Sequence, residues 1–190
     1  ALAKGWPARF LVVGLGLGYI EWMIFAKCYA KKVEPHILSL ESDPYLTGQI
    51  YKLVTRDYAE SQDMKVFEDA LAASAAYFGE PGLREMAFRA LSQERWKIGG
   101  TLDAGTEFER RSSVILYDPF SKRTSPELWE QAFLESFLMK AAGNPCVFST
   151  YASHGQLKRA LAAQGFSQEP RPGFGGKRES TLATFEKSLY

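Results

Sequence analysis

The sequence has 190 residues, of which 46% are hydrophobic and 24% are charged, and its formal net charge is +1. This composition predicts one soluble globular domain over residues 1–190 and excludes a disordered chain. The near-zero net charge excludes a positive field over the whole protein, so any nucleic acid would have to be bound by a local basic patch.

Two cysteines, Cys28 and Cys146, have neither metal-ligand spacing nor the pattern of a disulfide framework. We therefore expect a reducing, cytoplasmic setting and no bound metal. The longest apolar stretch, residues 9–30, contains three glycines and Glu21, which disfavours both a membrane span and a signal peptide. The first strand begins so close to residue 1 that we expect an N-terminal part of the protein to be missing from this sequence.

Apolar runs and helical periodicity alternate along the chain, which predicts an α/β fold with a mostly parallel, seven-stranded, Rossmann-like sheet. Helices are expected on both faces of this sheet, and a β-hairpin is expected at its C-terminal end. Strands are predicted at 9–13, 36–41, 95–98, 113–117, 146–151, 166–170 and 180–186. Helices are predicted at 19–32, within 44–93, at 126–142, and before Gly165 with Ser153 as the N-cap.

A glycine-rich loop follows the first strand and precedes its helix, where the missing Cβ atoms allow a nucleotide to approach the backbone. The G-x-G-x-G spacing is typical of S-adenosylmethionine loops, whereas a dinucleotide loop would have Gly or Ala where this chain has Tyr19. The alternative is that the glycines only pack a tight turn. The residues predicted to bind S-adenosylmethionine here are Gly14, Leu15, Gly16, Gly18 and Tyr19.

Acidic residues follow the second strand. Glu41 is predicted to accept hydrogen bonds from both ribose hydroxyls of an adenosine, with Asp43 as the alternative acceptor. Two residues before the glycine loop, methyltransferases usually have an acid, and this chain has Val12. The sequence therefore predicts a nucleoside-binding carboxylate but no acid for the methionine amino group at the usual position.

Asp118 ends the fourth strand and is followed directly by Pro119. Ligands lie beyond the carboxyl ends of the strands in a parallel sheet, so we expect Asp118 in the same crevice as the glycine loop and Glu41. A carboxylate at this position can hold an amine and accept its proton. The alternative is an aspartate that only begins a turn, because Pro119 cannot continue a ladder.

Three segments, "YDPFSKRTSPELW", "FSTYASHGQLKRALAAQGF" and "RPGFGGKRES", resemble consecutive motifs of the MnmC methyltransferase domain and its single-domain DUF752 relatives. The resemblance covers roughly residues 114–184 in order, and the glycine loop and Glu41 extend it to the start of the chain. It implies a class I S-adenosylmethionine-dependent methyltransferase without the FAD oxidase domain. The implied reaction adds a methyl group to the 5-aminomethyl group of the tRNA wobble uridine and gives 5-methylaminomethyl-2-thiouridine.

The same resemblance implies residue roles. Asp118 is the catalytic residue near the methyl group and the substrate amine, and Asp103, in "GGTLDAG", contacts the adenine. The loop at 171–179 carries a stacking aromatic between glycines and a basic cluster, which suits an unpaired anticodon base. The residues expected to contact tRNA are Phe120, Lys122, Arg123, Arg171, Phe174, Lys177 and Arg178.

Two alternatives to this function are a methyltransferase acting on another nucleophile and a non-catalytic member that binds RNA or a partner protein. No membrane contact is expected, the oligomeric state is open, and a monomer is compatible with the sequence. His36 and His154 are expected to be surface or capping residues, and Trp129 is expected in the core. Residues 44–112 carry no recognisable motif beyond Asp103.

Overall fold

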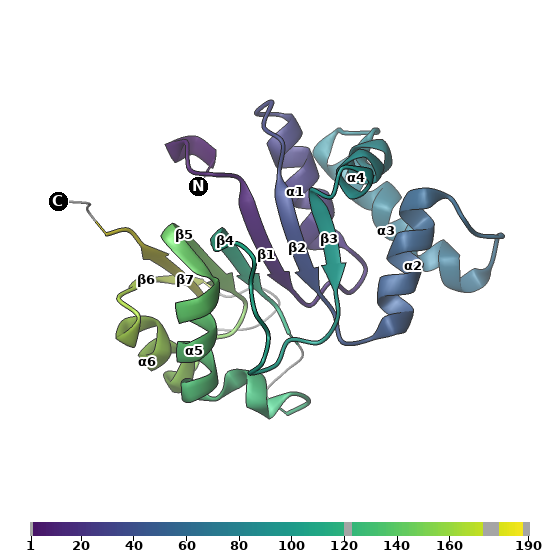
Figure 1. The fold of residues 1–190 in the computed structure, drawn as a ribbon. Helices are drawn as coiled ribbons and strands as arrows, with labels where there is room; N and C mark the ends of the chain where they lie inside the picture. Colours follow the sequence, from purple (N-terminus) through teal and green to yellow (C-terminus); the bar gives the residue numbers. More distant parts are fainter. Residues whose placement is uncertain (1, 120–122, 173–178, 188–190) are drawn as a thin grey trace. The chain divides into compact units, whose positions relative to one another are not determined.

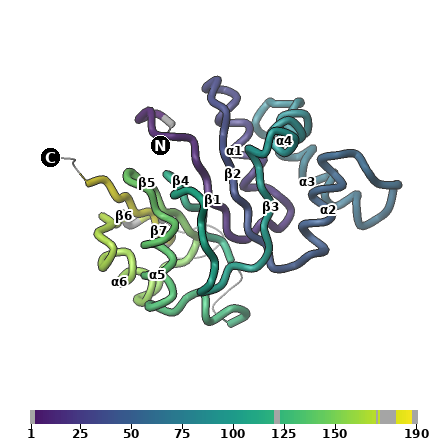
Figure 2. The backbone as a smooth tube through the Cα atoms, in the orientation of Figure 1, coloured from purple at the N-terminus to yellow at the C-terminus, as the bar shows by residue number. Residues whose placement is uncertain are grey.

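The computed structural model describes residues 2–119, 123–172 and 179–187 (Figure 1). The chain forms two compact units, and its backbone path is traced in Figure 2. The first unit consists of residues 1–13 and 102–190, and the second unit consists of residues 14–101. Each unit is described by itself.

The first unit contains five strands in the order β1-β4-β5-β7-β6. β1, β4 and β5 run parallel to their neighbours, whereas β7 is antiparallel to both β5 and β6. Helices α5 and α6 pack against each other (Figure 1). The elements of this unit are η1 (Leu2–Lys4), β1 (Arg9–Val13), β4 (Ser112–Tyr117), η2 (Pro126–Trp129), α5 (Gln131–Ala141), β5 (Ala142–Thr150), α6 (Gly155–Ala163), β6 (Ser167–Pro172) and β7 (Glu179–Phe185).

The second unit pairs β2 and β3 in parallel, with Ile37 opposite Trp96. Helix α1 packs against α3 and α4, and the rings of Trp22, Phe25 and Trp96 meet in its core. The elements of this unit are α1 (Tyr19–Tyr29), β2 (His36–Leu40), α2 (Pro44–Thr55), α3 (Gln62–Phe78), α4 (Leu83–Ser92) and β3 (Trp96–Gly99).

The predicted fold class is confirmed, since the strands form a mostly parallel seven-stranded sheet with a C-terminal hairpin. Each predicted strand is present, including the weak one at β3. Whether the chain is one domain stays a prediction. The connection between β3 and β4, residues 100–111, contains no helix.

The boundaries predicted between residues 126 and 146 are wrong. The single helix expected at 126–142 is divided at Glu130, whose extended backbone (φ −69°, ψ 140°) separates η2 from α5. The buried ring of Trp129 accounts for this division, because it packs edge-on against Tyr117, whose hydroxyl donates to the Leu128 carbonyl. Strand β5 begins at Ala142, directly after α5, and not at Cys146.

The expected N-cap of α6 is also wrong. His154, and not Ser153, caps this helix, because Nδ1 of His154 accepts a hydrogen bond from the Leu157 N–H. The prediction that His154 is a capping residue is thereby confirmed. Trp129 is a core residue, as predicted, and His36 is exposed at the start of β2.

Candidate cofactor and methyl-transfer site

The glycine loop adopts a conformation that only glycine adopts readily. Gly14, Gly16 and Gly18 all have positive φ, at 90°, 53° and 80°. At Gly18, which caps α1, an added Cβ would lie 3.0 Å from the Trp22 ring. At Gly16, an added Cβ would meet nothing within 4 Å, so the backbone there borders open space. The loop therefore leaves room for a ligand at Gly16 and closes against the helix at Gly18.

Glu41 and the glycine loop are in direct contact within the second unit. The Gly16 N–H donates to Oε2 of Glu41 at 3.1 Å, and the Asp43 N–H donates to Oε1 at 3.1 Å. The side chain is only 6% exposed. A carboxylate has about four acceptor positions, so two remain for a ligand after these bonds. Glu41 can thus shape the loop and accept a hydroxyl at the same time.

The alternative acceptor, Asp43, has a structural role of its own. It is the N-cap of α2, and its Oδ1 accepts a hydrogen bond from the Tyr45 N–H at 2.8 Å. Of the other loop residues, Leu15 is buried and Tyr19 is 54% exposed at the start of α1. Val12, at the position where an acid is usual, is fully buried in β1.

Sequence reasoning missed a buried carboxyl group in the second unit. Glu21, in the first turn of α1, is 0% exposed, and its Oε1 accepts a 2.6 Å hydrogen bond from the Ser39 hydroxyl. Ser39 in turn accepts from the Trp96 indole N–H at 3.0 Å, whereas Oε2 of Glu21 has no hydrogen-bond partner among the described residues. Burial raises the pKa of Glu21 to about 7, and the nearby charge of Glu41 adds to this shift. The signal in the sequence was an acid inside an otherwise apolar helix start.

Asp118 lies in the first unit, immediately after β4, and its side chain is exposed. Its backbone N–H donates to the Val13 carbonyl at 2.8 Å, so the ends of β4 and β1 are held together here. Tyr151 follows β5, and its hydroxyl donates to the Pro119 carbonyl at 3.0 Å. Burial raises the pKa of Tyr151, and the negative charge of Asp118 raises it further.

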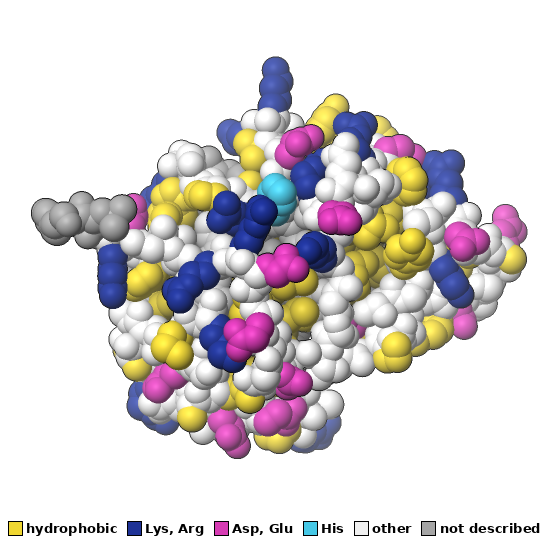
Figure 3. Space-filling model, viewed as in Figure 1, with side chains coloured by type: hydrophobic (Ala, Val, Ile, Leu, Met, Phe, Trp, Pro, Cys, Tyr) yellow, Lys and Arg dark blue, Asp and Glu magenta, His cyan; other side chains and the backbone are white. Residues whose placement is uncertain are grey.

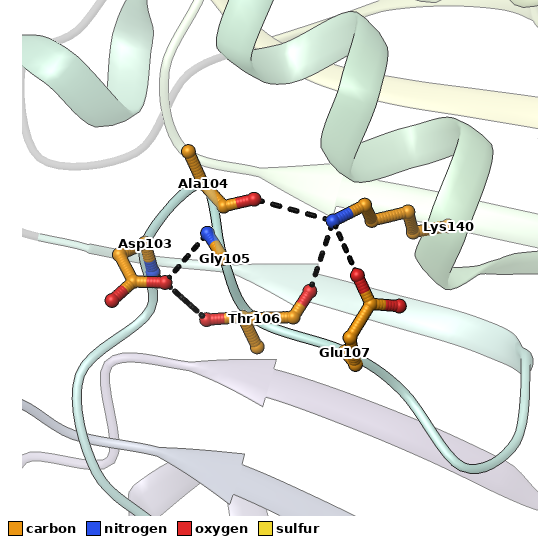
Figure 4. Close-up of polar contacts among 6 residues, drawn as sticks. All are labelled: Asp103, Ala104, Gly105, Thr106, Glu107 and Lys140. Carbon is orange, nitrogen blue, oxygen red and sulfur yellow. Dashed lines mark hydrogen bonds and ion pairs between the residues drawn. The ribbon is translucent and has the colours of Figure 1, made fainter.

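Asp103 caps its own turn in the first unit (Figure 4). Its Oδ1 accepts from the Gly105 N–H at 2.9 Å and from the Thr106 hydroxyl at 3.1 Å. The ammonium group of Lys140, on α5, donates to the Ala104 carbonyl at 3.2 Å and to the Glu107 carboxylate at 2.7 Å, and so also holds this turn. The turn borders a pocket of about 400 Å³ whose lining includes Leu102, Asp103, Glu127, Glu130, Phe133 and Phe137.

The predicted site residues therefore fall into two groups. The glycine loop and Glu41 belong to the second unit, and Asp103 and Asp118 belong to the first. The meeting of all four in one crevice stays a prediction. Of the expected tRNA contacts, Arg123 and Arg171 are exposed, and the others, Phe120, Lys122, Phe174, Lys177 and Arg178, lie outside the described residues.

Neither cysteine is a plausible nucleophile, because burial raises the pKa of Cys28 to about 11 and that of Cys146 to about 12. Both thiols are free. Within the described ranges, no cluster of three or more His, Cys, Asp or Glu side chains could hold a metal ion. No helix in the described part of the chain is long and apolar enough to cross a membrane.

Comparison with known proteins agrees with the geometry. A model of the S-adenosyl-L-methionine-dependent methyltransferase family designated Methyltransf_30 matches residues 82–186, more than half of the chain. A tRNA 5-methylaminomethyl-2-thiouridine biosynthesis bifunctional protein, MnmC, of Paraburkholderia xenovorans is 27% identical over 97% of this chain and 29% of its own length. Its counterpart in Leptospira borgpetersenii is 28% identical over 91% of this chain and 26% of its own length. The chain thus spans less than a third of these relatives.

Solved structures show the same fold. MNMC2 from Aquifex aeolicus superposes with a TM-score of 0.59 at 20% identity, covering 96% of this chain and 55% of that one. The glycopeptide N-methyltransferase MtfA superposes with a TM-score of 0.55 at 11% identity, covering 98% of this chain and 92% of that one. At these identities the likeness is one of fold.

Proposed function

Because the chain belongs to the Methyltransf_30 family of S-adenosyl-L-methionine-dependent methyltransferases, we propose that it methylates the amine of 5-aminomethyl(-2-thio)uridine at the wobble position of tRNA. The product is the 5-methylaminomethyl nucleoside. The whole-length relatives named for this modification, which align with 91% and 97% of this chain, support the choice of substrate. A tRNA substrate assigns the protein to the cytoplasm.

The cofactor fits the residues of the second unit. Gly16 borders open space, the N-terminus of α1 follows the loop, and Glu41 keeps two acceptor positions for the ribose hydroxyls. In the first unit, Asp103 and the aromatic lining of its pocket are the residues we assign to the adenine. S-adenosylmethionine supplies an electrophilic methyl group bonded to a sulfonium sulfur.

The position of Asp118 is the observation that carries the proposal for the reaction. Its exposed carboxylate stands at the carboxyl end of β4, and its N–H is bonded to Val13, the residue that directly precedes Gly14 in the chain. We assign it two tasks: to accept a proton from the substrate ammonium group and to hold the neutral amine with its lone pair directed at the methyl carbon. Asp118 would pass the first proton to solvent and, as a carboxylate, accept a hydrogen bond from the amine N–H. The amine nitrogen would then bond to the methyl carbon as the carbon–sulfur bond breaks and the sulfur leaves as a neutral thioether, and the methylated ammonium would release its proton to solvent.

The substrate is tested by mass spectrometry of tRNA nucleosides from cells that lack the protein. We expect 5-aminomethyl-uridine to accumulate and the methylated nucleoside to disappear. The purified chain should restore the methylated nucleoside on this tRNA when S-adenosylmethionine is added. An unchanged nucleoside profile, with methyl transfer to a different acceptor, would assign the chain to another substrate.

The choice of cofactor gives a binding prediction. We expect calorimetry to detect binding of S-adenosylmethionine or its demethylated product and no binding of NAD, because Tyr19 occupies the last glycine position of a dinucleotide loop. Gly16→Val should weaken binding by about tenfold or more, because a β-branched residue is strained at a φ of 53°. Gly48→Ala, within helix α2, is the matched control and should leave the affinity unchanged. Tighter binding of NAD would contradict the assignment.

The tRNA contact gives a salt-dependence prediction. Basic and acidic side chains are interspersed on the face shown in Figure 3, so we expect a few local contacts rather than a broad field. Replacing Arg123 and Arg171 with Gln should weaken tRNA binding and flatten the slope of log K against log salt by about one unit for each of the two side chains that neutralises a phosphate. Lys65→Gln, on α3 in an ion pair with Asp69, is the control. Unchanged affinity and slope would exclude both arginines, and Lys177 and Arg178 would be the next pair to test.

A further inference from the structure

Tyr151 is fixed beside Asp118 by the register of two parallel strands. Leu116 of β4 lies opposite Ser149 of β5, and the same register continued by two residues brings Asp118 opposite Tyr151. The hydrogen bond from the Tyr151 hydroxyl to the Pro119 carbonyl, at 3.0 Å, agrees with this pairing. The tyrosine therefore contacts the backbone carbonyl of the residue directly after the aspartate.

Hydrogen bonds hold the backbone directly after Tyr151. The buried Thr150 hydroxyl accepts from the Ala152 N–H at 3.2 Å, and the buried Thr181 hydroxyl of β7 donates to the Ala152 carbonyl at 2.7 Å. The Tyr151 ring lies 6.5 Å from the buried Trp129 ring, centroid to centroid. These contacts restrict the directions in which the tyrosine hydroxyl can point.

Asp118 is consequently held by one backbone hydrogen bond at its own N–H and by a second at the carbonyl of the residue that follows it. On the N-terminal side, its own N–H is bonded to the Val13 carbonyl at 2.8 Å. On the C-terminal side, the next carbonyl, that of Pro119, is bonded to Tyr151. A proline has no N–H with which to make a further backbone bond, so the Pro119 carbonyl is its backbone hydrogen-bonding group.

We propose that Tyr151 is a positioning residue for the methyl transfer, whose hydroxyl holds the carbonyl of Pro119, the residue directly after Asp118, and thereby restricts the direction of the Asp118 carboxylate. It acts through Asp118 and does not touch the cofactor. The proposal rests on the proposed function, because it takes Asp118 as the group that holds the amine. Loss of the hydroxyl should therefore slow the chemical step and leave the binding of both ligands unaltered.

Tyr151→Phe removes the hydroxyl and keeps the ring on Trp129. Under single-turnover conditions with tRNA that carries 5-aminomethyl-uridine, we expect the rate to fall by about tenfold, as for the loss of one hydrogen bond. The KM for tRNA and the Kd for S-adenosylmethionine should change less than about twofold in the same assays. Tyr58→Phe removes a hydroxyl that donates to Glu68 and is the matched control, with an unchanged rate.

A double-mutant cycle separates positioning from a general structural role. If Tyr151 acts through Asp118, Tyr151→Phe should have no further effect on the residual rate of Asp118→Asn. An equal loss in both backgrounds would overturn the proposal, because it would show that the hydroxyl acts independently of the carboxylate.

Hydrogen exchange gives a measurement that needs no substrate. The Asp118 amide should exchange several-fold faster in Tyr151→Phe, whereas the amides of β7 and the unfolding midpoint should stay at the wild-type values. Exchange of Asp118 at the wild-type rate would overturn the proposal. If the wild-type chain transfers no methyl group to this tRNA, the proposed function fails. The exchange measurement then still decides whether the Tyr151 hydroxyl anchors the backbone at Asp118.

Discussion

Asp118→Asn should lower kcat/KM for methyl transfer by about 10²–10⁴, the usual contribution of a positioned general acid or base. The change keeps the size and shape of the side chain and removes only its charge and its capacity to accept a proton. Because the side chain is exposed and its structural anchor is the backbone N–H bonded to Val13, the fold should be unaffected. The measurement is the single-turnover rate with S-adenosylmethionine and the proposed tRNA.

Two further variants define what the carboxylate does. Asp118→Glu keeps the charge and displaces it by one methylene, so partial activity is expected if position matters as well as charge. Asp69→Asn makes the same chemical change on α3, where the carboxylate pairs with Lys65, and should leave the rate unchanged. Affinity for S-adenosylmethionine should be retained throughout. Near-wild-type turnover of Asp118→Asn would reduce Asp118 to a residue that only begins a turn.

Glu21→Gln should stabilise the protein at alkaline pH relative to the wild type, because the buried carboxyl group of Glu21 resists ionisation. Its pKa rises from 4.5 to about 7 on folding, with burial as the main cause. Below pH 4.5 the group is neutral in both states and costs nothing. As the pH rises to about 7, the unfolded chain loses this proton more readily than the folded one, so stability falls; above pH 7 the loss is complete.

The size of the effect follows from the shift. A shift of this size corresponds to roughly 3 kcal/mol at 1.36 kcal/mol per pKa unit. Urea unfolding of both proteins from pH 4 to pH 9 should show their difference in free energy of unfolding growing by about this amount and then levelling off. The Gln amide oxygen can still accept the bond from Ser39, so this contact is kept.

Glu85→Gln is the control for the stability measurement. Glu85 is exposed and pairs with Arg56, and replacing it should produce no comparable dependence on pH. If the free-energy difference between Glu21→Gln and the wild type does not change with pH, Glu21 is not the buried titrating group described above. Either result is independent of the proposed substrate.

Local signals in the sequence were sufficient for most of the elements and for the glycine loop between β1 and α1. The run at Arg9–Val13, followed by glycines and a helix, predicts the strand, loop and helix that the structure contains. The positive φ angles at Gly14, Gly16 and Gly18 are a local property that other residues rarely adopt, which is why the loop was recognisable.

Where local signals failed, a long-range contact decided. The pattern of residues 126–142 is helical throughout, yet the packing of Trp129 on Tyr117 divides it at Glu130. The choice of His154 over Ser153 as N-cap could not be predicted, since both residue positions precede the same helix. A cap depends on which backbone N–H a side chain can reach, and only the folded chain determines that distance.

The sequence by itself determined the fold class, the methyltransferase type of glycine loop and the acids that follow the strands, because each depends on residue type and spacing along the chain. Only the tertiary structure decided the environment of three groups. It buried Glu21 on Ser39, tied the Glu41 carboxylate to Gly16, and brought the Tyr151 hydroxyl to the Pro119 carbonyl. Burial and hydrogen bonding between residues 18 to 32 positions apart arise from packing, and no periodicity in the sequence records them.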